Sequence, residues 1–180
     1  MRSITNTQGA LLIIIMLALL VTAPVFANPE TAPKNCTGTI SPGISVQEWK
    51  DDFGIGFNLT SPWFLFEKAA IRVSGNILFK ADAQWKPYYA IRTGLIGGSF
   101  MQSADIRLYG EGGFLFLFPD ASFDTTSFRF GGYGNFGFEF FLSTTPGSGS
   151  YFIELGSNGI GATTLSGNYY LNGFALTTGI

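Results

Sequence analysis

The stretch FRFGGYGNFGFEF, residues 128–140, alternates between phenylalanine and small or polar residues. All of its phenylalanines have even numbers, whereas its charged and amide side chains, Arg129, Asn135 and Glu139, have odd numbers. Successive side chains of a β-strand point to opposite faces of the sheet, so a period of two puts the phenylalanines on one face. The stretch therefore predicts a strand with one apolar and one polar face.

The same alternation recurs along the rest of the chain. Clear runs lie at 53–60, 71–80, 89–95, 105–118, 151–156 and 174–180, and a weaker one lies at 43–50. Turn residues such as Lys50-Asp51-Asp52 and Ala81-Asp82-Ala83 separate the runs, and such short connections favour antiparallel hairpins. Seven or eight sequential strands of this kind close most naturally into an antiparallel up-and-down β-barrel. We therefore expect an all-β fold with about eight strands.

Charges on the run at 105–118 predict how it pairs with the stretch at 128–140. If Arg107 opposes Glu139, opposite charges meet, whereas the next register sets Asp105 against Glu139 and brings like charges together. The first register also covers strand glycines with aromatic rings, an arrangement that supports such glycines. It predicts the pairs Tyr109–Gly137, Gly113–Tyr133, Phe116–Phe130 and Phe118–Phe128.

The first 42 residues have a different composition. Arg2 precedes an apolar run from Ala10 to Val21, and Val25-Phe26-Ala27 then provides small residues for cleavage after Ala27. This is the layout of a secretory signal peptide, with an uncleaved anchor as the alternative. Residues 28–42 are rich in Pro, Thr and Asn and predict an irregular leader. The expected organisation is a signal peptide (1–27), a leader (28–42) and a β-barrel domain (43–180).

The direction of the two faces decides the class of barrel. Only 12% of the residues are charged, about half the usual share, so a polar face in water would be unusually poor in charge. The phenylalanines of the 128–140 strand would crowd a narrow lumen but fit against lipid. We therefore expect a transmembrane barrel with a packed polar lumen. The alternative is a soluble, periplasmic lipocalin-like barrel that binds a small apolar ligand.

The central charges balance, four of each sign, and this predicts an ion network inside the lumen because an unpaired buried charge is costly. The predicted members are Arg72, Arg92, Asp105, Arg107, Glu111, Arg129, Glu139 and Glu154. Aromatic residues near strand ends predict interfacial girdles of the kind that flank membrane barrels. These are Trp49, Trp63, Trp85, Tyr88, Tyr89, Tyr169 and Tyr170.

Sequence features for catalysis and cofactors are few. The chain has no histidine, which removes most acid–base, nucleophilic and metal-site schemes. The G-x-G-x-x-G match at 132–137 lies inside an alternating run, whereas a dinucleotide site needs it between a strand and a helix. A net charge of −2 argues against nucleic acid as a partner. We expect no enzyme activity, no cofactor and no metal.

The signal peptide, the Gly- and Phe-rich alternating runs and the final run NGFALTTGI (172–180) resemble small bacterial outer-membrane β-barrel proteins. The similarity is to the eight-stranded class, which includes the opacity-type and OmpA-like barrels, and it covers residues 43–180. The chain departs from that class by ending in Ile180, where such proteins usually have an aromatic residue. The resemblance implies a monomeric barrel in the bacterial outer membrane, with outer-membrane lipid and the insertion machinery as partners. It implies roles in envelope integrity, adhesion or host interaction.

Overall fold

The computed structural model describes residues 38–101, 105–143, 148–167 and 173–180. The predicted signal peptide and residues 28–37 of the leader lie outside this part of the chain. The described residues form β-strands joined by turns, together with one short 3-10 helix, η1 (Ala81–Ala83). Within them, no helix has the length and apolar character needed to cross a membrane.

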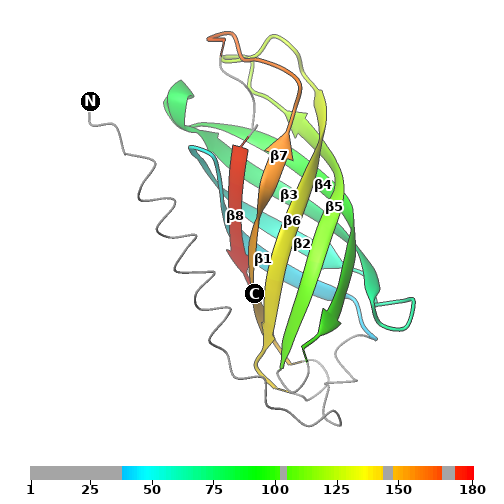
Figure 1. Ribbon diagram of the computed structural model, residues 1–180. Coiled ribbons are helices and arrows are strands. Elements are labelled where there is room, and N and C mark those ends of the chain that lie inside the picture. The colour runs from blue at the N-terminus through cyan, green and yellow to red at the C-terminus, as the bar shows by residue number, and fades with distance from the viewer. Residues whose placement is uncertain (1–37, 102–104, 144–147, 168–172) are drawn as a thin grey trace, which may run out of the picture.

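Eight strands follow one another in a closed barrel (Figure 1). Their bounds are β1 Ser41–Trp49, β2 Asp52–Thr60, β3 Ala69–Lys80, β4 Lys86–Phe100, β5 Ile106–Phe118, β6 Arg129–Phe141, β7 Ser150–Gly159 and β8 Gly173–Gly179. Each strand is antiparallel to its neighbours, and β8 closes the ring against β1. The prediction of an all-β, eight-stranded antiparallel barrel is thus confirmed, and the weak run at 43–50 is β1.

The register predicted for the β5–β6 hairpin is also confirmed. Arg107 pairs with Glu139. The ladder also pairs Tyr109 with Gly137, Gly113 with Tyr133, and Phe116 with Phe130. The Phe118 and Phe128 rings meet just beyond the ladder, with their centroids 5.7 Å apart. Charge and glycine positions were therefore sufficient to fix this pairing.

The registers together determine the shear of the barrel. From Ser41 in β1, successive paired positions lead through Thr60, Arg72, Gly94, Gly113 and Tyr133 to Asn158 in β7. Extending the last two registers to the strand ends places Asn158 beside Gly173, and Gly173 beside position 51 of the first hairpin. One circuit therefore advances from residue 41 to residue 51, which is a shear number of ten. In a closed barrel such a stagger requires strands tilted by about 40°.

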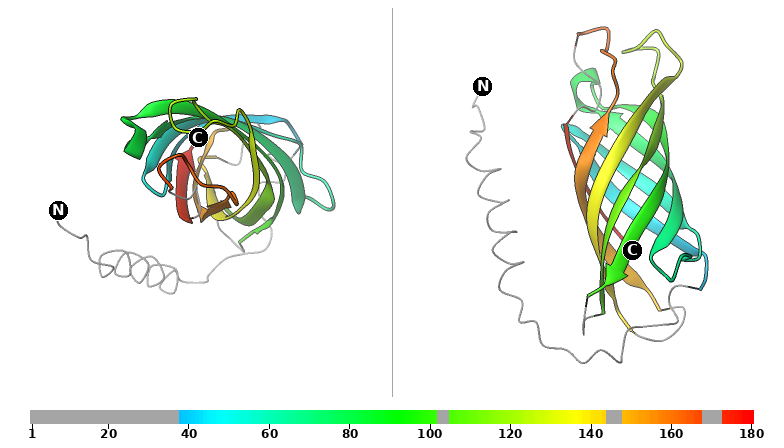
Figure 2. Two further views of the ribbon diagram at one scale, coloured as in Figure 1. Left: turned by 90° about the horizontal axis from the view of Figure 1, so that it is seen from above. Right: turned by 45° about the vertical axis from the view of Figure 1, so that its right-hand side comes forward.

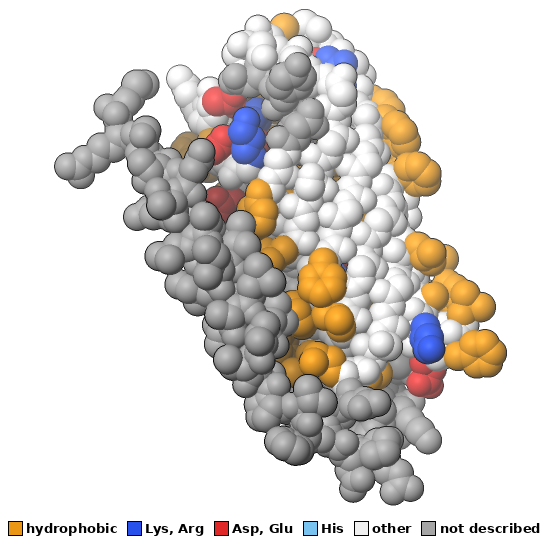
Figure 3. Space-filling model, viewed as in Figure 1, with side chains coloured by type: hydrophobic (Ala, Val, Ile, Leu, Met, Phe, Trp, Pro, Cys, Tyr) orange, Lys and Arg blue, Asp and Glu red, His pale blue; other side chains and the backbone are white. Residues whose placement is uncertain are grey.

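The two faces of the wall differ sharply in polarity. Side chains with an apolar character, such as Ile55, Val73 and Phe130, point outward and are about half exposed. Polar and ionic side chains point inward, together with buried apolar ones such as Leu78 and Leu115, into the ring seen from above in Figure 2. Among the described strand residues, the exposed charged side chains are Glu48 and Lys86, both next to a strand end. Figure 3 accordingly shows apolar side chains along the wall and charged ones toward its ends.

The predicted aromatic girdle is partly wrong. Trp49 and Tyr88 lie inside the barrel and are fully buried. Odd-numbered residues of β1 and even-numbered residues of β4 face inward, and these two side chains follow that alternation. Trp63 is half-buried, whereas Trp85 and Tyr89 are exposed on the outside. Tyr169 and Tyr170 lie outside the described residues. A strand-end position alone therefore does not place an aromatic side chain at the outer rim.

The two ends of the barrel are distinct. The start of β1 and the end of β8 lie at one end, here called the terminal end, which is the lower end in Figure 1. The opposite end, the loop end, has an apolar cluster inside the barrel that includes Leu78, Tyr88, Leu115 and Leu117. Phe123 from the β5–β6 connection packs on this cluster, with its ring 5.9 Å from that of Tyr88.

Candidate functional site

Arg72 on β3 lies at the centre of an ionic cluster inside the barrel. Its guanidinium contacts two carboxylates, with Nη1 donating to Glu111 at 2.8 Å and also to Glu154. Its Nε donates to the Thr60 hydroxyl at 3.1 Å. All four residues are buried, and they come from β2, β3, β5 and β7. The cluster therefore ties together opposite sides of the barrel.

Hydroxyl and amide groups complete the coordination of these two carboxylates. The Tyr133 hydroxyl donates to Glu111 at 2.5 Å, and the Tyr109 hydroxyl donates to Glu154 at 2.6 Å. Asn135 Nδ2 donates to the second oxygen of Glu154 at 3.2 Å. Buried carboxylates need such donors because burial removes their contacts with water. We name Arg72, Glu111, Glu154, Tyr109 and Tyr133 the central cluster.

Arg92 on β4 is held differently. It is only 2% exposed, and its guanidinium lies over two aromatic rings, 5.1 Å from the Tyr133 centroid and 5.4 Å from the Trp49 centroid. Within the described residues no carboxylate forms an ion pair with it. The faces of aromatic rings attract cations, so these rings partly compensate the buried charge. The expectation that Arg92 joins a pair in the ion network is therefore wrong in this detail.

Arg107 forms a second ionic contact near the terminal end. Its Nη1 donates to Glu139 at 3.0 Å, and Ser150 donates to the other Glu139 oxygen at 2.7 Å. Its guanidinium also lies 3.9 Å from the ring centroid of Trp63. The rings of Phe100 and Phe141 lie 4.5 Å and 4.9 Å away. These side chains surround Arg107 beside a hollow of about 490 Å³, which Arg72 also lines.

A third ionic group near the loop end was absent from the prediction. Lys80 contacts Asp52 at 3.3 Å, and the Tyr88 hydroxyl donates to the same carboxylate at 2.7 Å. The turn-like segment Lys50-Asp51-Asp52 concealed the role of Asp52, which is the first residue of β2 and points inward. Asp52 has an even number, like Gly54 and Gly56 on the same strand, and this alternation could have placed its side chain in the lumen.

Two predicted residues lie away from the central cluster. Asp105 is exposed in the turn before β5, so its side chain is not among the inward-facing groups. The strand begins one residue later, which removes Asp105 from the polar face that its parity suggested. Arg129 at the start of β6 pairs instead with Asp124 of the preceding connection, at 2.9 Å. The structure thus distributes the predicted residues over several groups.

The two tyrosines of the central cluster pack against strand glycines. A side chain at Gly137 would collide with the Tyr109 ring, which fits the predicted pair. The Tyr133 ring leans toward β4 instead, where it occupies the space above Gly94 rather than above its paired Gly113. This tilt brings the Tyr133 hydroxyl to Glu111 and its ring to Arg92. The glycines therefore leave room for the rings that carry the cluster's hydroxyls.

Two connections flanking β3 contain unusual backbone conformations. Leu65, Phe66 and Glu67 have φ values of 50°, 60° and 62°, and Gln84 and Trp85 have values of 58° and 60°. Left-handed backbone costs a residue other than glycine about 1–2 kcal/mol. Hydrogen bonds hold both turns, since Phe64 and Ala69 bridge around the first and Trp85 N donates to Lys80 O at 2.9 Å in the second.

The described residues contain no group of three or more His, Cys, Asp or Glu side chains suited to hold a metal. Comparisons with models of protein families, with curated proteins and with solved structures found no match. The geometry of the barrel is therefore what indicates its function.

Proposed function

We propose that this chain is a non-enzymatic integral β-barrel protein of the bacterial outer membrane, with a structural or surface-interaction role in the envelope. The observation that carries the proposal is the outward face. Exposed side chains near the centres of the strands, such as Ile55, Val73, Ile91 and Phe136, are apolar. Glu48 and Lys86, the exposed charges on the described strand residues, lie beside strand ends. An apolar band bounded by polar ends suits lipid, whereas water would make so large an apolar surface costly.

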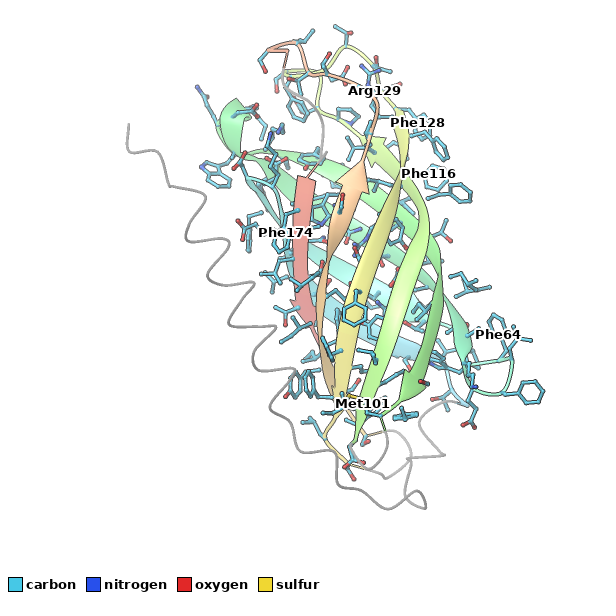
Figure 4. All side chains as sticks on the ribbon, in the orientation of Figure 1. Phe64, Met101, Phe116, Phe128, Arg129 and Phe174 are labelled. Atoms are coloured by element: carbon cyan, nitrogen blue, oxygen red, sulfur yellow. The ribbon has the colours of Figure 1, made fainter. Side chains whose placement is uncertain are left out.

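The dimensions of the barrel support the same proposal. The strands contain between 7 and 15 residues, and a tilted membrane strand needs about 9–11. Phenylalanines such as Phe116, Phe128 and Phe174 stand on the outside of the wall in Figure 4, and the last two are exposed. A lipocalin-like barrel would instead turn its apolar face inward, toward a ligand, and here the inner face carries the ions.

The lumen supports a structural rather than a catalytic role. Glu111 is held by Arg72 and Tyr133, and Glu154 by Arg72, Tyr109 and Asn135. A carboxylate acting as a general acid or base must reach a substrate proton, and these carboxylates are directed at protein groups. The apolar cluster at the loop end fills the lumen beyond them. The central cluster and the apolar cluster thus occupy the lumen beyond the hollow at the terminal end, and this arrangement favours mechanical stability over transport.

Fractionation tests the proposed location. The protein expressed with residues 1–27 in place should sediment with outer membranes and resist extraction by carbonate. A closed barrel should also migrate differently on a gel when the sample is left unboiled. Recovery in a detergent-free soluble fraction, with equal mobility in both samples, would overturn the proposal.

Matched arginine substitutions test which surface faces lipid. Val73→Arg places a charge at the centre of the outward face, and Ser99→Arg places one on the same face near a strand end. In lipid vesicles we expect Val73→Arg to reduce the free energy of unfolding by about 2–4 kcal/mol, and Ser99→Arg by about 0–1 kcal/mol. Equal, small effects at the two positions would indicate that water surrounds the barrel.

A further inference from the structure

The β2–β3 connection divides its large side chains between two directions. Trp63 turns inward and lies over Arg107. The next three residues, Phe64, Leu65 and Phe66, are exposed, and Phe66 is 93% exposed, the highest value among the large apolar side chains described. A fixed turn that presents Phe66 to its surroundings in this way requires an explanation.

The turn is fixed rather than loose. Phe64 N donates to Ala69 O at 2.7 Å, and Ala69 N donates back to Phe64 O at 3.1 Å. Lys68 O accepts a hydrogen bond of 2.8 Å from Gly98 N, which anchors the base of the turn to β4. Leu65 and Phe66 occupy left-handed backbone between these anchors. The backbone thus adopts an unfavourable conformation that keeps two apolar side chains outside.

The turn projects sideways from the barrel. In Figure 4 the label of Phe64 marks it at the lower right, where it extends away from the wall. Figure 3 shows an apolar group at this place, with a basic and an acidic side chain beside it. Glu67 and Lys68, which follow the apolar residues, are both exposed. An apolar tip with charges next to it matches the boundary between acyl chains and headgroups.

A similar tip occurs at the other end of β3. Trp85 is 57% exposed, has a positive φ and precedes Lys86, which is also exposed. The two tips lie at opposite ends of β3, which has 12 residues. With a rise of about 3.3 Å per residue and a tilt of about 40°, they are separated by about 30 Å along the barrel axis. The apolar band of membrane barrels is about 25 Å tall. The two tips therefore lie at levels that correspond to the two rims of the band.

We propose that Leu65 and Phe66 at the terminal end, and Trp85 at the loop end, insert into the two lipid interfaces and set the depth of the barrel in the membrane. The neighbouring Lys68 and Lys86 then face lipid phosphates, which attract basic side chains close to the surface. This inference rests on the proposed membrane location. It keeps Trp85 from the interfacial girdle expected from the sequence, adds Leu65 and Phe66 to it, and assigns to these residues the depth of the barrel.

Spin labels on single cysteines test the tip at the terminal end. Cys36, the only native cysteine, is first replaced by serine, and Phe66→Cys, Asp105→Cys and Val73→Cys are then labelled separately. Asp105 is the matched control, because it is exposed in the neighbouring turn at the same end. Val73 reports on the middle of the outer wall. Each protein is folded into phosphatidylcholine–phosphatidylglycerol vesicles, and collisions of the label with oxygen and with a water-soluble nickel chelate are measured.

We expect the ratio of oxygen to nickel collisions to be several-fold higher at Phe66→Cys than at Asp105→Cys, and highest at Val73→Cys. Water-like values at Phe66→Cys with lipid-like values at Val73→Cys would overturn the insertion of Phe66 into the lipid interface but not the membrane location. Water-like values at Val73→Cys would overturn both. Protection of the label at Phe66→Cys from both reagents would show that this position contacts protein, and it would also overturn the insertion of Phe66 into lipid.

Two further measurements keep the proposal testable if Phe66→Cys fails to fold. Leu65→Cys places a label on the same tip and should give the same lipid-like ratio. At the loop end, lipids brominated near the headgroup should quench the fluorescence of the native protein more than that of Trp85→Phe. Equal fractional quenching of the two proteins would contradict an interfacial position for Trp85.

Discussion

Arg72 and Arg92 are buried on neighbouring strands of the same inner face, yet the barrel holds them in different ways. Arg72 contacts the carboxylates of Glu111 and Glu154. Arg92 lies over the rings of Trp49 and Tyr133. In the first arrangement one positive and two negative charges stabilise one another, so removing one leaves the others uncompensated. In the second, the faces of neutral rings stabilise the positive charge. The two arginines should therefore respond very differently to the same substitution.

The comparison also concerns charge balance. Arg72 with its two carboxylates leaves one negative charge in excess, and Arg92 carries one positive charge without a contacting carboxylate. Tyr133 links them, because its hydroxyl donates to Glu111 while its ring lies 5.1 Å from the Arg92 guanidinium. Tyr133 thus lies between the excess negative charge of the central cluster and the positive charge of Arg92.

The largest effect is expected for Arg72→Met. It leaves the two buried carboxylates without their cation, and removing one partner of a buried ion pair costs about 3–5 kcal/mol. Urea unfolding in lipid vesicles, followed by tryptophan fluorescence, measures the loss in the free energy of unfolding. Adding Glu111→Gln and Glu154→Gln to Arg72→Met should recover much of the loss, because the cluster is then neutral. No recovery would mean that packing, not charge, accounts for the cost.

Much of the fold could be predicted because strand alternation records which face each side chain occupies. Parity along 128–140 separated the outward phenylalanines from the inward polar residues, and the positions of Arg107 and Glu139 fixed one hairpin register. The shear number was not predictable in the same way. It depends on the registers of all eight strand pairs, and most of these lack an opposing charge pair that would select one.

The site was less predictable than the fold, for a related reason. Parity placed Arg92 correctly inside but could not show that its neighbours across the lumen are Trp49 and Tyr133. Contacts across a barrel depend on its shear and diameter, which a single strand does not record. Asp52 was missed because it stands at a strand end, where a turn composition conceals the alternation. Lys80 lies on the polar face of the run at 71–80, but without Asp52 it had no partner that would have placed it in an ion pair.

A smaller effect is expected for Tyr133→Phe. The substitution keeps the ring over Gly94 and beside Arg92 but removes the hydroxyl that donates to Glu111. Loss of a hydrogen bond to a buried charged group costs about 1.5–3 kcal/mol, measured by the same urea unfolding. Tyr89→Phe, on the exposed outer face, is the matched control and should leave stability unchanged. A loss as large as that of Arg72→Met would place most of the cluster's stability in this one bond.

Arg92→Met should have a still smaller effect. The variant loses two cation–ring contacts, yet it also removes a buried charge that no carboxylate contacts. These contributions oppose each other, so the net change in unfolding free energy is expected to be below about 1 kcal/mol. A loss equal to that of Arg72→Met would contradict the comparison, since it would show that both arginines contribute equally to stability despite their different contacts.

The smallest effect concerns Asp120, an acidic side chain in the β5–β6 connection that is held by hydrogen bonds rather than by an ion pair. Hydrogen bonds from the Ser122 side chain and from its backbone N–H, at 2.8 Å, lower the pKa of the Asp120 carboxyl, and Lys86 adds a minor contribution. Stability from this group is present above the usual pKa of an aspartate and is lost as the pH falls through the lowered value.

Ser122→Ala should therefore raise the pKa of Asp120 toward its usual value, as followed by carboxyl carbon chemical shifts during an acid titration. The backbone N–H remains, so part of the lowering should persist. Lys86→Gln is the comparison variant and should raise the pKa less, because the charge is the weaker cause. A larger rise in Lys86→Gln would show that Asp120, like the carboxylates of the central cluster, depends chiefly on a cation.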